Sequence, residues 1–143
     1  MEAIKNKFDN FIKTYKALDK SMKVLHRVAS QVPEDEHDVI VAGVIKHFEL
    51  TYETTWKFLK EYIAINHNEE ILSPRSVFKA CYAYGILPQE ITDDLLELVD
   101  DRNLTVHIYD HITAEEICSS IAKYYMSLGK IIELLGPNII TNF

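Results

Sequence analysis

Apolar residues recur every three or four positions along most of the chain, and this spacing restricts the possible folds more than any other feature. In the first segment the recurring residues are Ile4, Phe8, Phe11, Tyr15, Leu18, Met22, Leu25 and Val28. Lys, Asp and Asn fill most of the positions between them. Because an α-helix has 3.6 residues per turn, these apolar side chains share one face, and the segment is predicted to form a long amphipathic helix.

Two further helices are expected in the next part of the chain. The segment 31–37 contains Pro33 and an acidic run, so it is expected to separate the first helix from a second one that begins near Asp38 and fades around 66–68. Ser73 followed by Pro74 is typical of a helix start, with serine as the N-cap. The short third helix that comes next is expected to end at Gly85.

The last third of the sequence predicts two more helices. One opens at Pro88 and reaches Asp101, beyond which β-branched residues weaken the helical preference. Thr113 and Glu116 have the spacing of a capping box for a final helix. That helix is expected to stop at 136–137, a Gly-Pro pair.

These elements predict one all-α domain spanning residues 1–143. No segment shows the alternation of a strand, and Gly and Pro number only four each, which leaves little room for long loops. A chain of 143 residues is an ordinary size for a single domain with its own core. Long helices with short connections favour an antiparallel up-and-down bundle of four to five helices.

The overall charge and the cysteines narrow the functional classes. A net charge of −7 argues against tight non-specific binding of nucleic acid, so RNA chemistry would need a local basic site on an acidic body.

Cys81 and Cys118 lie far apart without a metal-binding pattern and are expected to be buried, reduced thiols. No apolar stretch has the length of a membrane span, and no targeting segment is visible at the N-terminus; a cytoplasmic protein without a membrane partner is expected.

The segment 100–110 concentrates polar side chains that can carry out chemistry. On a continuous helix Asn103 and His107 are four residues apart and share a face, while Arg102 and Tyr109 are seven apart and share the neighbouring face. Histidine can transfer protons near neutral pH, and arginine can hold a phosphate and stabilise charge on it. The set Arg102, Asn103 and His107 therefore suits RNA cleavage without a metal. Alternatively, Arg102 pairs with a surface carboxylate and His107 merely lies at a helix boundary.

A second group of residues is a candidate pocket for a nucleotide or phosphate. Its members are Glu53, Trp56, Lys57, Lys60 and Arg75. The alternative is that Trp56 belongs to the core and Glu53 forms an i,i+4 pair with Lys57. His107, Asp110 and His111 are too few for a metal site, so neither a metal nor a cofactor is expected.

Two of these regions together resemble one family. Residues 47–60 read HFELTYETTWKFLK, which is similar to the HFExxxExxWKxLK helix of nucleotidyltransferase substrate-binding proteins. Ser73-Pro74-Arg75, Ala80 and Gly85-Ile86 continue the resemblance, and Arg102, His107 and Tyr109 match the Rx4HxY pattern of the HEPN superfamily. The resemblance extends over nearly the whole chain.

The resemblance implies a homodimeric helical bundle that works with a minimal nucleotidyltransferase encoded nearby. In the HEPN toxins of such pairs, Arg102 and His107 would form a ribonuclease site at the dimer cleft, with Asn103 as a polar helper. The partner would transfer AMP to Tyr109 and silence the toxin, since a bulky anion beside the cleft repels RNA phosphate. The alternatives are a non-catalytic substrate-binding subunit, to which the sequence is most similar, and a purely structural dimerisation module.

Overall fold

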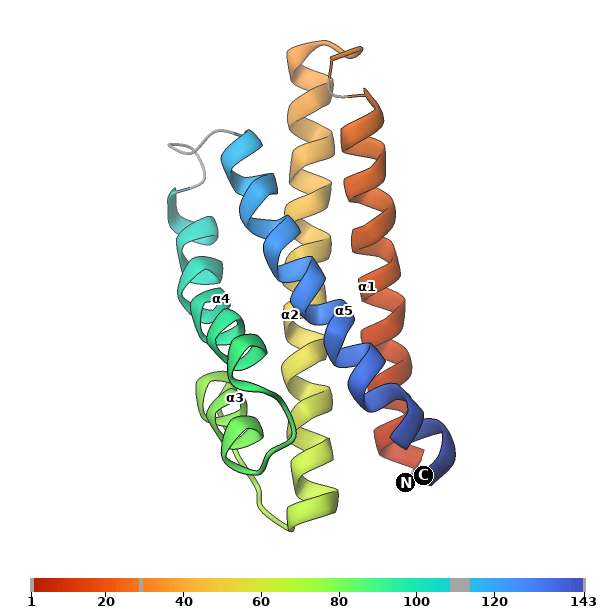
Figure 1. Cartoon of the computed structure of the whole chain (residues 1–143). Helices are drawn as coiled ribbons and strands as arrows, with labels where there is room; N and C mark the ends of the chain where they lie inside the picture. The colour runs from red at the N-terminus through yellow and green to blue at the C-terminus, as the bar shows by residue number, and fades with distance from the viewer. Residues whose placement is uncertain (1, 29, 109–113, 143) are drawn as a thin grey trace.

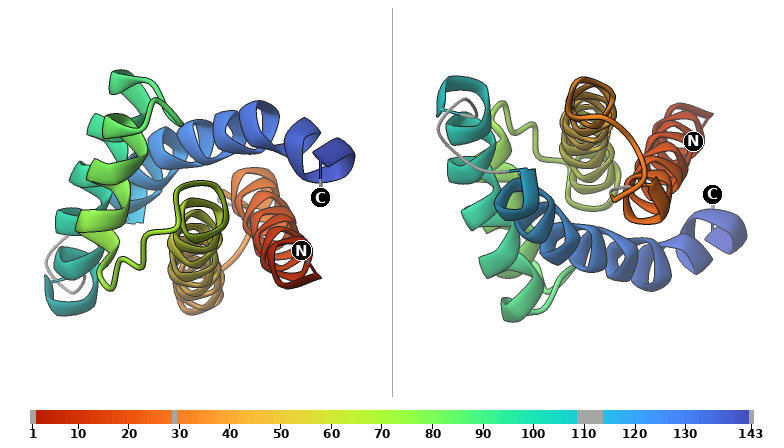
Figure 2. Two further views of the ribbon diagram at one scale, coloured as in Figure 1. Left: turned by 90° about the horizontal axis from the view of Figure 1, so that it is seen from below. Right: turned by 90° about the horizontal axis from the view of Figure 1, so that it is seen from above.

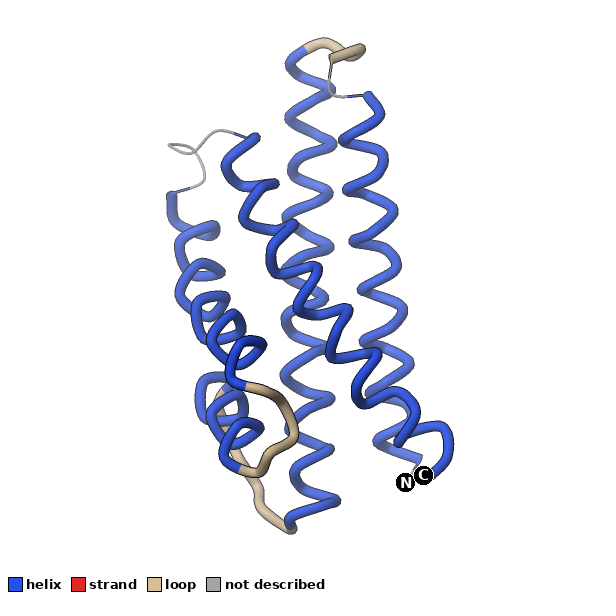
Figure 3. The backbone as a smooth tube through the Cα atoms, viewed as in Figure 1, coloured by secondary structure: helices blue, strands red, loops and turns tan. Residues whose placement is uncertain are grey.

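The computed structural model describes residues 2–28, 30–108 and 114–142, and it describes side chains for all of these except 101–108, 114, 115, 117, 141 and 142. Five helices account for most of the described residues, and these residues contain no strand (Figures 1 and 3). The helices are α1 (Glu2–Val28), α2 (Glu34–His67), α3 (Pro74–Ala83), α4 (Gln89–Ile108) and α5 (Ala114–Asn142). The predicted all-α helical bundle is therefore confirmed.

The three longest helices, α1, α2 and α5, form the body of the bundle. Helices α1 and α2 run antiparallel along their length, and α5 crosses over both (Figures 1 and 2). Helix α3 packs against α2 and α4, and α4 packs against α5. In the end-on views of Figure 2, α1 and α4 consequently lie on opposite sides of the molecule.

Aromatic side chains fill the centre of the core. Phe58 of α2 is fully buried and packs against Phe8 and Phe11 of α1, with ring centroids 5.2 and 5.9 Å away. Phe48 stacks on Tyr124 of α5 at 6.0 Å. Tilted and stacked rings at these distances add about 0.5–1.5 kcal/mol per pair to the burial of their area. The apolar stripes seen in the sequence thus converge from α1, α2 and α5.

The ends of α2 and α3 follow local sequence signals. Asn68 adopts a left-handed conformation, with φ 53°, and its N–H donates to the carbonyl of Ala64, which closes α2. The hydroxyl of Ser73 accepts a hydrogen bond from the N–H of Ser76 at 3.3 Å, as an N-cap does. Gly85 has φ +70°, a conformation that other residues rarely adopt, so glycine is needed in the turn between α3 and α4.

The predicted start of α2 is wrong. Helix α2 begins at Glu34 rather than near Asp38, with Pro33 as its cap residue. The acidic run that was expected to interrupt the helices instead forms the first turn of α2, where carboxylates are favoured by the positive end of the helix dipole.

The predicted end of α5 is also wrong, since the helix does not stop at Gly136-Pro137 but continues to Asn142. Proline inside a helix removes one backbone hydrogen bond and costs about 3 kcal/mol. Burial of Ile139, which is only 3% exposed, offsets much of that cost, since a fully buried isoleucine contributes about 1.5–3 kcal/mol. Tertiary packing therefore extends the helix beyond its local stop signal.

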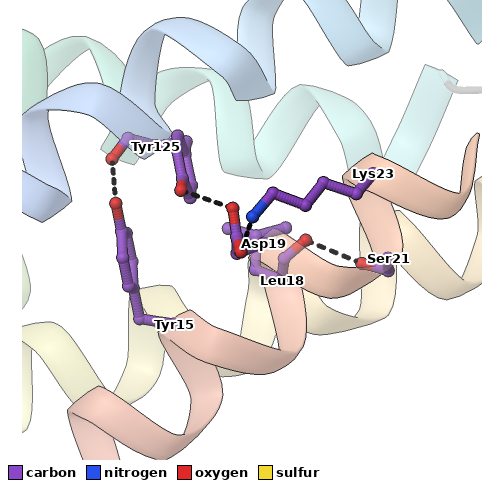
Figure 4. Close-up of polar contacts among 6 residues, drawn as sticks. All are labelled: Tyr15, Leu18, Asp19, Ser21, Lys23 and Tyr125. Carbon is purple, nitrogen blue, oxygen red and sulfur yellow. Dashed lines mark hydrogen bonds and ion pairs between the residues drawn. The ribbon is translucent and has the colours of Figure 1, made fainter. Parts of the chain in front are cut away.

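A polar cluster joins α5 to α1 (Figure 4). The rings of Tyr15 and Tyr125 stack with centroids 4.8 Å apart, and the Tyr15 hydroxyl donates to the Tyr125 carbonyl at 3.3 Å. The Tyr125 hydroxyl donates to Asp19 at 2.5 Å, and Asp19 forms an ion pair of 2.8 Å with Lys23. Gly129 makes this approach possible, since a Cβ there would lie 2.5 Å from the Tyr15 hydroxyl.

Cys81 is buried, as expected, whereas Cys118 is only partly buried, and the two form no disulfide with each other. Tyr124 is buried, and Tyr125 is partly buried and packs against the core. Within the described ranges, no helix is long and apolar enough to cross a membrane.

Candidate functional site

The candidate catalytic residues lie on the last two turns of α4. The backbone of α4 is helical through Ile108, so Asn103 and His107 are one turn apart and Arg102 precedes them on the same helix. The β-branched residues of this segment do not end the helix before Ile108. Tyr109, the expected modification site, lies outside the described residues, as do Thr113 of the expected capping box and the Asp110 and His111 considered as metal ligands.

Neighbouring helices hold the part of α4 that leads to these residues. Leu95 and Leu98 are buried in the core and fix one face of α4. On another side, three acidic residues spaced three apart each bind a polar partner on α3 or α5. Ser127 of α5 donates to Asp94 at 2.6 Å, Lys123 of α5 pairs with Glu97, and Arg75 of α3 pairs with Asp100 at 2.6 Å. Lys123 also lies 3.8 Å from Asp94. The direction in which α4 presents its end is therefore set by α3 and α5 together.

Arg75 links the two regions that the sequence singled out. Its Nη2 donates to Asp100, two residues before Arg102, which brings the start of α3 next to the motif-bearing part of α4. The pair is exposed, with side chains 45% and 67% accessible, so it contributes at most about 1 kcal/mol. Arg75 was predicted as a possible phosphate ligand; its guanidinium here binds a carboxylate.

The other candidate pocket residues lie on α2. The indole N–H of Trp56 donates to Glu53 at 3.1 Å, and the Trp56 ring is half-buried against the core. Lys57 is exposed and Lys60 is half-buried. The hydrogen bond between Glu53 and Trp56 orients the indole, which favours the packing interpretation of Trp56 over a free stacking surface.

Three cavities on the described surface are lined by residues outside both groups. One of about 460 Å³ lies between α1 and α2 and is lined by residues including Lys20, Gly43 and His47. Another, of about 410 Å³, lies between the end of α2 and the end of α5, beside Tyr62 and Asn138. A third, of about 280 Å³, borders the cluster of Asp19 and Tyr125. No group of metal-ligating side chains occurs in the part of the chain that the structure describes.

The charge around the motif is negative. Helix α4 carries six acidic residues and one arginine, which gives it a net charge of −5. Three of the acids share two basic partners: Asp100 pairs with Arg75, and both Asp94 and Glu97 pair with Lys123. These pairs reduce but do not remove the negative field. Phosphate is therefore not attracted to this helix by its overall charge.

Two features of the site were not predicted from the sequence. The spacing of Asp94, Glu97 and Asp100 indicates that they share one side of a helix. Their partners could not be predicted, because they lie on other helices and are distant in sequence. Arg75 lies 25 positions before Asp100, and Lys123 lies 26 positions after Glu97. His47, noted only as the start of a motif, has a buried Nδ1 with no hydrogen-bond partner in the described structure. Burial of a single atom leaves no trace in sequence periodicity.

Comparison with known proteins gives the family. The profile of the family described as "Nucleotidyltransferase substrate binding protein like" matches residues 6–136. The chain belongs to this family, and the HEPN-type bundle expected from the sequence is consistent with that membership. Among curated proteins there is no match.

A solved structure supports the same fold. The chain is similar to a Thermus thermophilus protein whose crystal structure carries the name ttk003001694, with 29% sequence identity and a TM-score of 0.63. The similarity covers 81% of this chain and 96% of that one. The bundle described above is thus an arrangement already seen by crystallography in a similar protein.

Proposed function

We propose that this chain is the helical partner of a minimal nucleotidyltransferase and that it acts as a metal-independent endoribonuclease, silenced by transfer of AMP to Tyr109. Membership of the nucleotidyltransferase substrate-binding family supports the partner role. The observation that supports the chemistry is the helical backbone of α4 through Ile108, which carries Arg102, Asn103 and His107 on consecutive turns.

The proposed reaction uses the 2′-hydroxyl of the RNA as the nucleophile. A histidine removes the proton of that hydroxyl, the oxygen attacks the adjacent phosphorus, and the bond from phosphorus to the 5′-oxygen breaks. The leaving oxygen takes a proton, so the products are a 2′,3′-cyclic phosphate and a 5′-hydroxyl. Arg102 would stabilise the charge that develops on the phosphate oxygens, and Asn103 would supply a further hydrogen bond.

A single histidine cannot easily serve as base and acid in the same step. A homodimer that places two copies of His107 at one cleft supplies both roles, one ring accepting a proton while the other donates. The proposal therefore includes a dimer in which the ends of the two α4 helices face one another.

Transfer of AMP to Tyr109 would act by charge and bulk. The tyrosine oxygen would attack the α-phosphate of ATP, pyrophosphate would leave, and the phenolic proton would pass to solvent. Tyr109 comes directly after the last residue of α4 in the sequence, so its AMP group would bring a negative charge close to the cleft and repel the phosphates of RNA.

The proposal is tested by incubating RNA with the purified dimer in EDTA, next to the variants Arg102→Ala, His107→Ala and His37→Ala. The last is a matched control, since His37 lies on the first turns of α2, in a different part of the chain from α4. Cleavage by the wild type and by His37→Ala, but not by the other two variants, is expected. Equal cleavage by all four chains would point to a contaminating nuclease and would overturn the assignment.

A second candidate function is a non-catalytic subunit that presents substrate to the nucleotidyltransferase. The net charge of −5 on α4 and the description of the family favour it. A folded dimer that cleaves no RNA, yet increases the rate of nucleotide transfer by its partner, would support this second function and exclude the first.

A further inference from the structure

The outer face of α1 carries a continuous basic stripe. Its members are Lys13, Lys16, Lys20, Lys23 and Arg27, spaced three, four, three and four residues apart, and all five side chains are exposed. Helical geometry makes them neighbours on one face that is about 21 Å long. These five residues are called the α1 stripe.

The stripe contrasts with the rest of the molecule. Helix α1 contains seven Lys and Arg residues and three acidic ones, so its net charge is +4, whereas the whole chain has −7. The remainder of the chain therefore has a net charge of −11. Such separation of charge concentrates a positive field on one side of the bundle, the side opposite to the acidic α4 (Figure 2).

Folding alone does not account for the stripe. Each consecutive pair in it places like charges at i,i+3 or i,i+4, which destabilises a helix by about 0.2–0.5 kcal/mol per pair. Lys23 is relieved by Asp19, which lies 2.8 Å away. Lys13, Lys16, Lys20 and Arg27 make no ion pair with any residue whose side chain is described. Their charges thus remain available to an external anion.

The cavity of about 460 Å³ between α1 and α2 adjoins the stripe. Lys20 belongs both to the stripe and to the lining of the cavity. Ile40 forms an apolar wall, and Gly43 leaves open space beside it. His47 also lines this cavity, and its Nδ1 is buried without a hydrogen-bond partner among the described residues. Because Nδ1 is shielded from solvent, the contribution of the cavity to a ligand is its volume and its apolar wall.

We infer that the α1 stripe and this cavity form a docking surface for single-stranded RNA. The stripe binds successive phosphates, and the cavity takes an unstacked base that packs on its apolar wall. A single strand fits because its bases are free to turn away from one another, whereas those of a duplex are paired and stacked. The choice of RNA as the polyanion rests on the proposed function; the surface itself does not depend on the residues proposed for cleavage.

An anionic membrane is the competing occupant, and the surface is poorly built for it. Helices that lie on membranes combine a basic face with exposed large apolar residues. Of the large apolar side chains that are strongly exposed among the described residues, none lies on α1. The buried apolar residues of α1 point into the core instead.

The test measures binding apart from cleavage. A short fluorescently labelled single-stranded RNA is titrated with chains that all carry His107→Ala, and anisotropy is followed as a function of salt. Lys16→Gln/Lys20→Gln is expected to weaken binding about 25-fold at about 0.1 M salt and to lower the slope of log K against log salt by about 1.4, as expected for two lost phosphate contacts on a single strand. Glutamine is about as good a helix former as lysine, so α1 is retained.

The matched control is Lys79→Gln/Lys130→Gln, which removes the same charge from exposed positions on α3 and α5. It is expected to change affinity less than about threefold, because neither lysine belongs to the α1 stripe. An equal loss in both double variants would mean that only net charge matters and would overturn the proposal. So would stronger binding to phosphatidylserine vesicles than to RNA, or no RNA binding at all.

The cavity is tested by Gly43→Leu. Space is open around Gly43, so the leucine is expected to fill the cavity without loss of thermal stability. RNA binding should weaken about fivefold or more, since stacking and contacts of one base contribute about 1–3 kcal/mol. Unchanged affinity in a stable Gly43→Leu chain would show that no base enters the cavity. Since all these chains lack His107, a failure of RNA cleavage in the wild type would not affect the result, and a failure of binding would not by itself exclude cleavage.

Discussion

The guanidinium of Arg75, on the first turn of α3, donates a 2.6 Å hydrogen bond to the carboxylate of Asp100, two residues before Arg102. This contact joins two motifs that are separated in sequence and holds α4 from the side of α3. Because both side chains are exposed, the contact orients α4 relative to α3 more than it stabilises the folded protein.

A double-mutant cycle on Arg75→Ala and Asp100→Ala measures this link. We expect each single variant to lower the free energy of unfolding slightly and the coupling energy to be about 0.2–1 kcal/mol, because exposed ion pairs are screened by solvent. Urea unfolding of the four chains gives the value. Strictly additive effects would show that the two side chains do not interact in solution.

The close approach of Gly129 to Tyr15 leads to a second prediction, on the stability of a Gly129 variant. Gly129→Ala places a Cβ 2.5 Å from the Tyr15 hydroxyl, so either the Tyr15 side chain must leave its place against Tyr125 or α5 and α1 must separate. The free energy of unfolding is expected to fall by about 1–3 kcal/mol. In the Tyr15→Phe background the nearest remaining atom is the ring Cζ at 3.3 Å, and the loss should be smaller.

The matched control for that substitution is Gly43→Ala. No atom lies within 4 Å of a Cβ at Gly43, so alanine is expected to stabilise α2 by up to about 1 kcal/mol. Thermal unfolding of the glycine variants compares the two sites. If Gly129→Ala were as stable as Gly43→Ala, the close approach of α1 and α5 would be wrong.

Asp19 is expected to make the stability of the folded protein depend on pH in the acidic range. Hydrogen bonds from Lys23 and Tyr125 lower the pKa of the Asp19 carboxyl below its ordinary value of 3.8. A lowered pKa in the folded state means stability that is present above the unfolded pKa and is lost as pH falls through the folded one. Asp19→Asn should therefore destabilise the protein at neutral pH, and the difference from wild type should shrink below about pH 4. A difference that stays constant from neutral pH to about pH 3 would contradict this.

The cluster of Tyr15, Asp19 and Tyr125 is expected to make stability depend on pH in the alkaline range as well. The hydrogen bond to Asp19 and the contact with Tyr15 raise the pKa of Tyr125 well above its ordinary value of 10.0. A raised pKa means stability that is present below the unfolded pKa and is lost as pH rises through the folded one. Above about pH 10 the wild type is expected to lose stability relative to Tyr125→Phe, which has no proton to lose. Parallel curves for the two chains would argue against the cluster.

Cysteine labelling tests the core. Burial raises the pKa of the Cys81 thiol to about 12, so little thiolate is present at neutral pH. Cys118 is only partly buried. Iodoacetamide is expected to modify Cys118 first and Cys81 only at the rate of unfolding, which peptide mass spectrometry resolves. Rapid modification of Cys81 in the native protein would contradict its place in the core.

Local signals and periodicity were enough for most of the fold. Ser73, Pro74 and Gly85 act through their own backbone preferences, so the limits of α3 could be predicted from the sequence. Pro137 could not be judged in the same way, because burial of Ile139 in the core offsets much of its local effect. The start of α2 was missed because an acidic run looks like a solvated loop unless the helix dipole is considered.

The candidate site was predictable only as a set of residue types. The sequence singled out Arg102 and His107, but it gave no indication that Arg75 would pair with Asp100 or that Lys123 would pair with Glu97. The lysines of α1 have the spacing of the ordinary polar side of an amphipathic helix. Their importance emerged from the burial pattern, which shows that they share one exposed face on which only Lys23 has a neutralising partner among the described side chains.

The most direct test of the central claim is the chemistry of the RNA ends. RNA is incubated in EDTA with the wild-type protein and with His107→Ala, and the termini of the fragments are analysed. We expect 2′,3′-cyclic phosphate and 5′-hydroxyl ends from the wild type and no fragments from the variant. Intact RNA with a well-folded wild-type protein, or fragments with 5′-phosphate ends, would contradict a metal-independent ribonuclease built on Arg102 and His107.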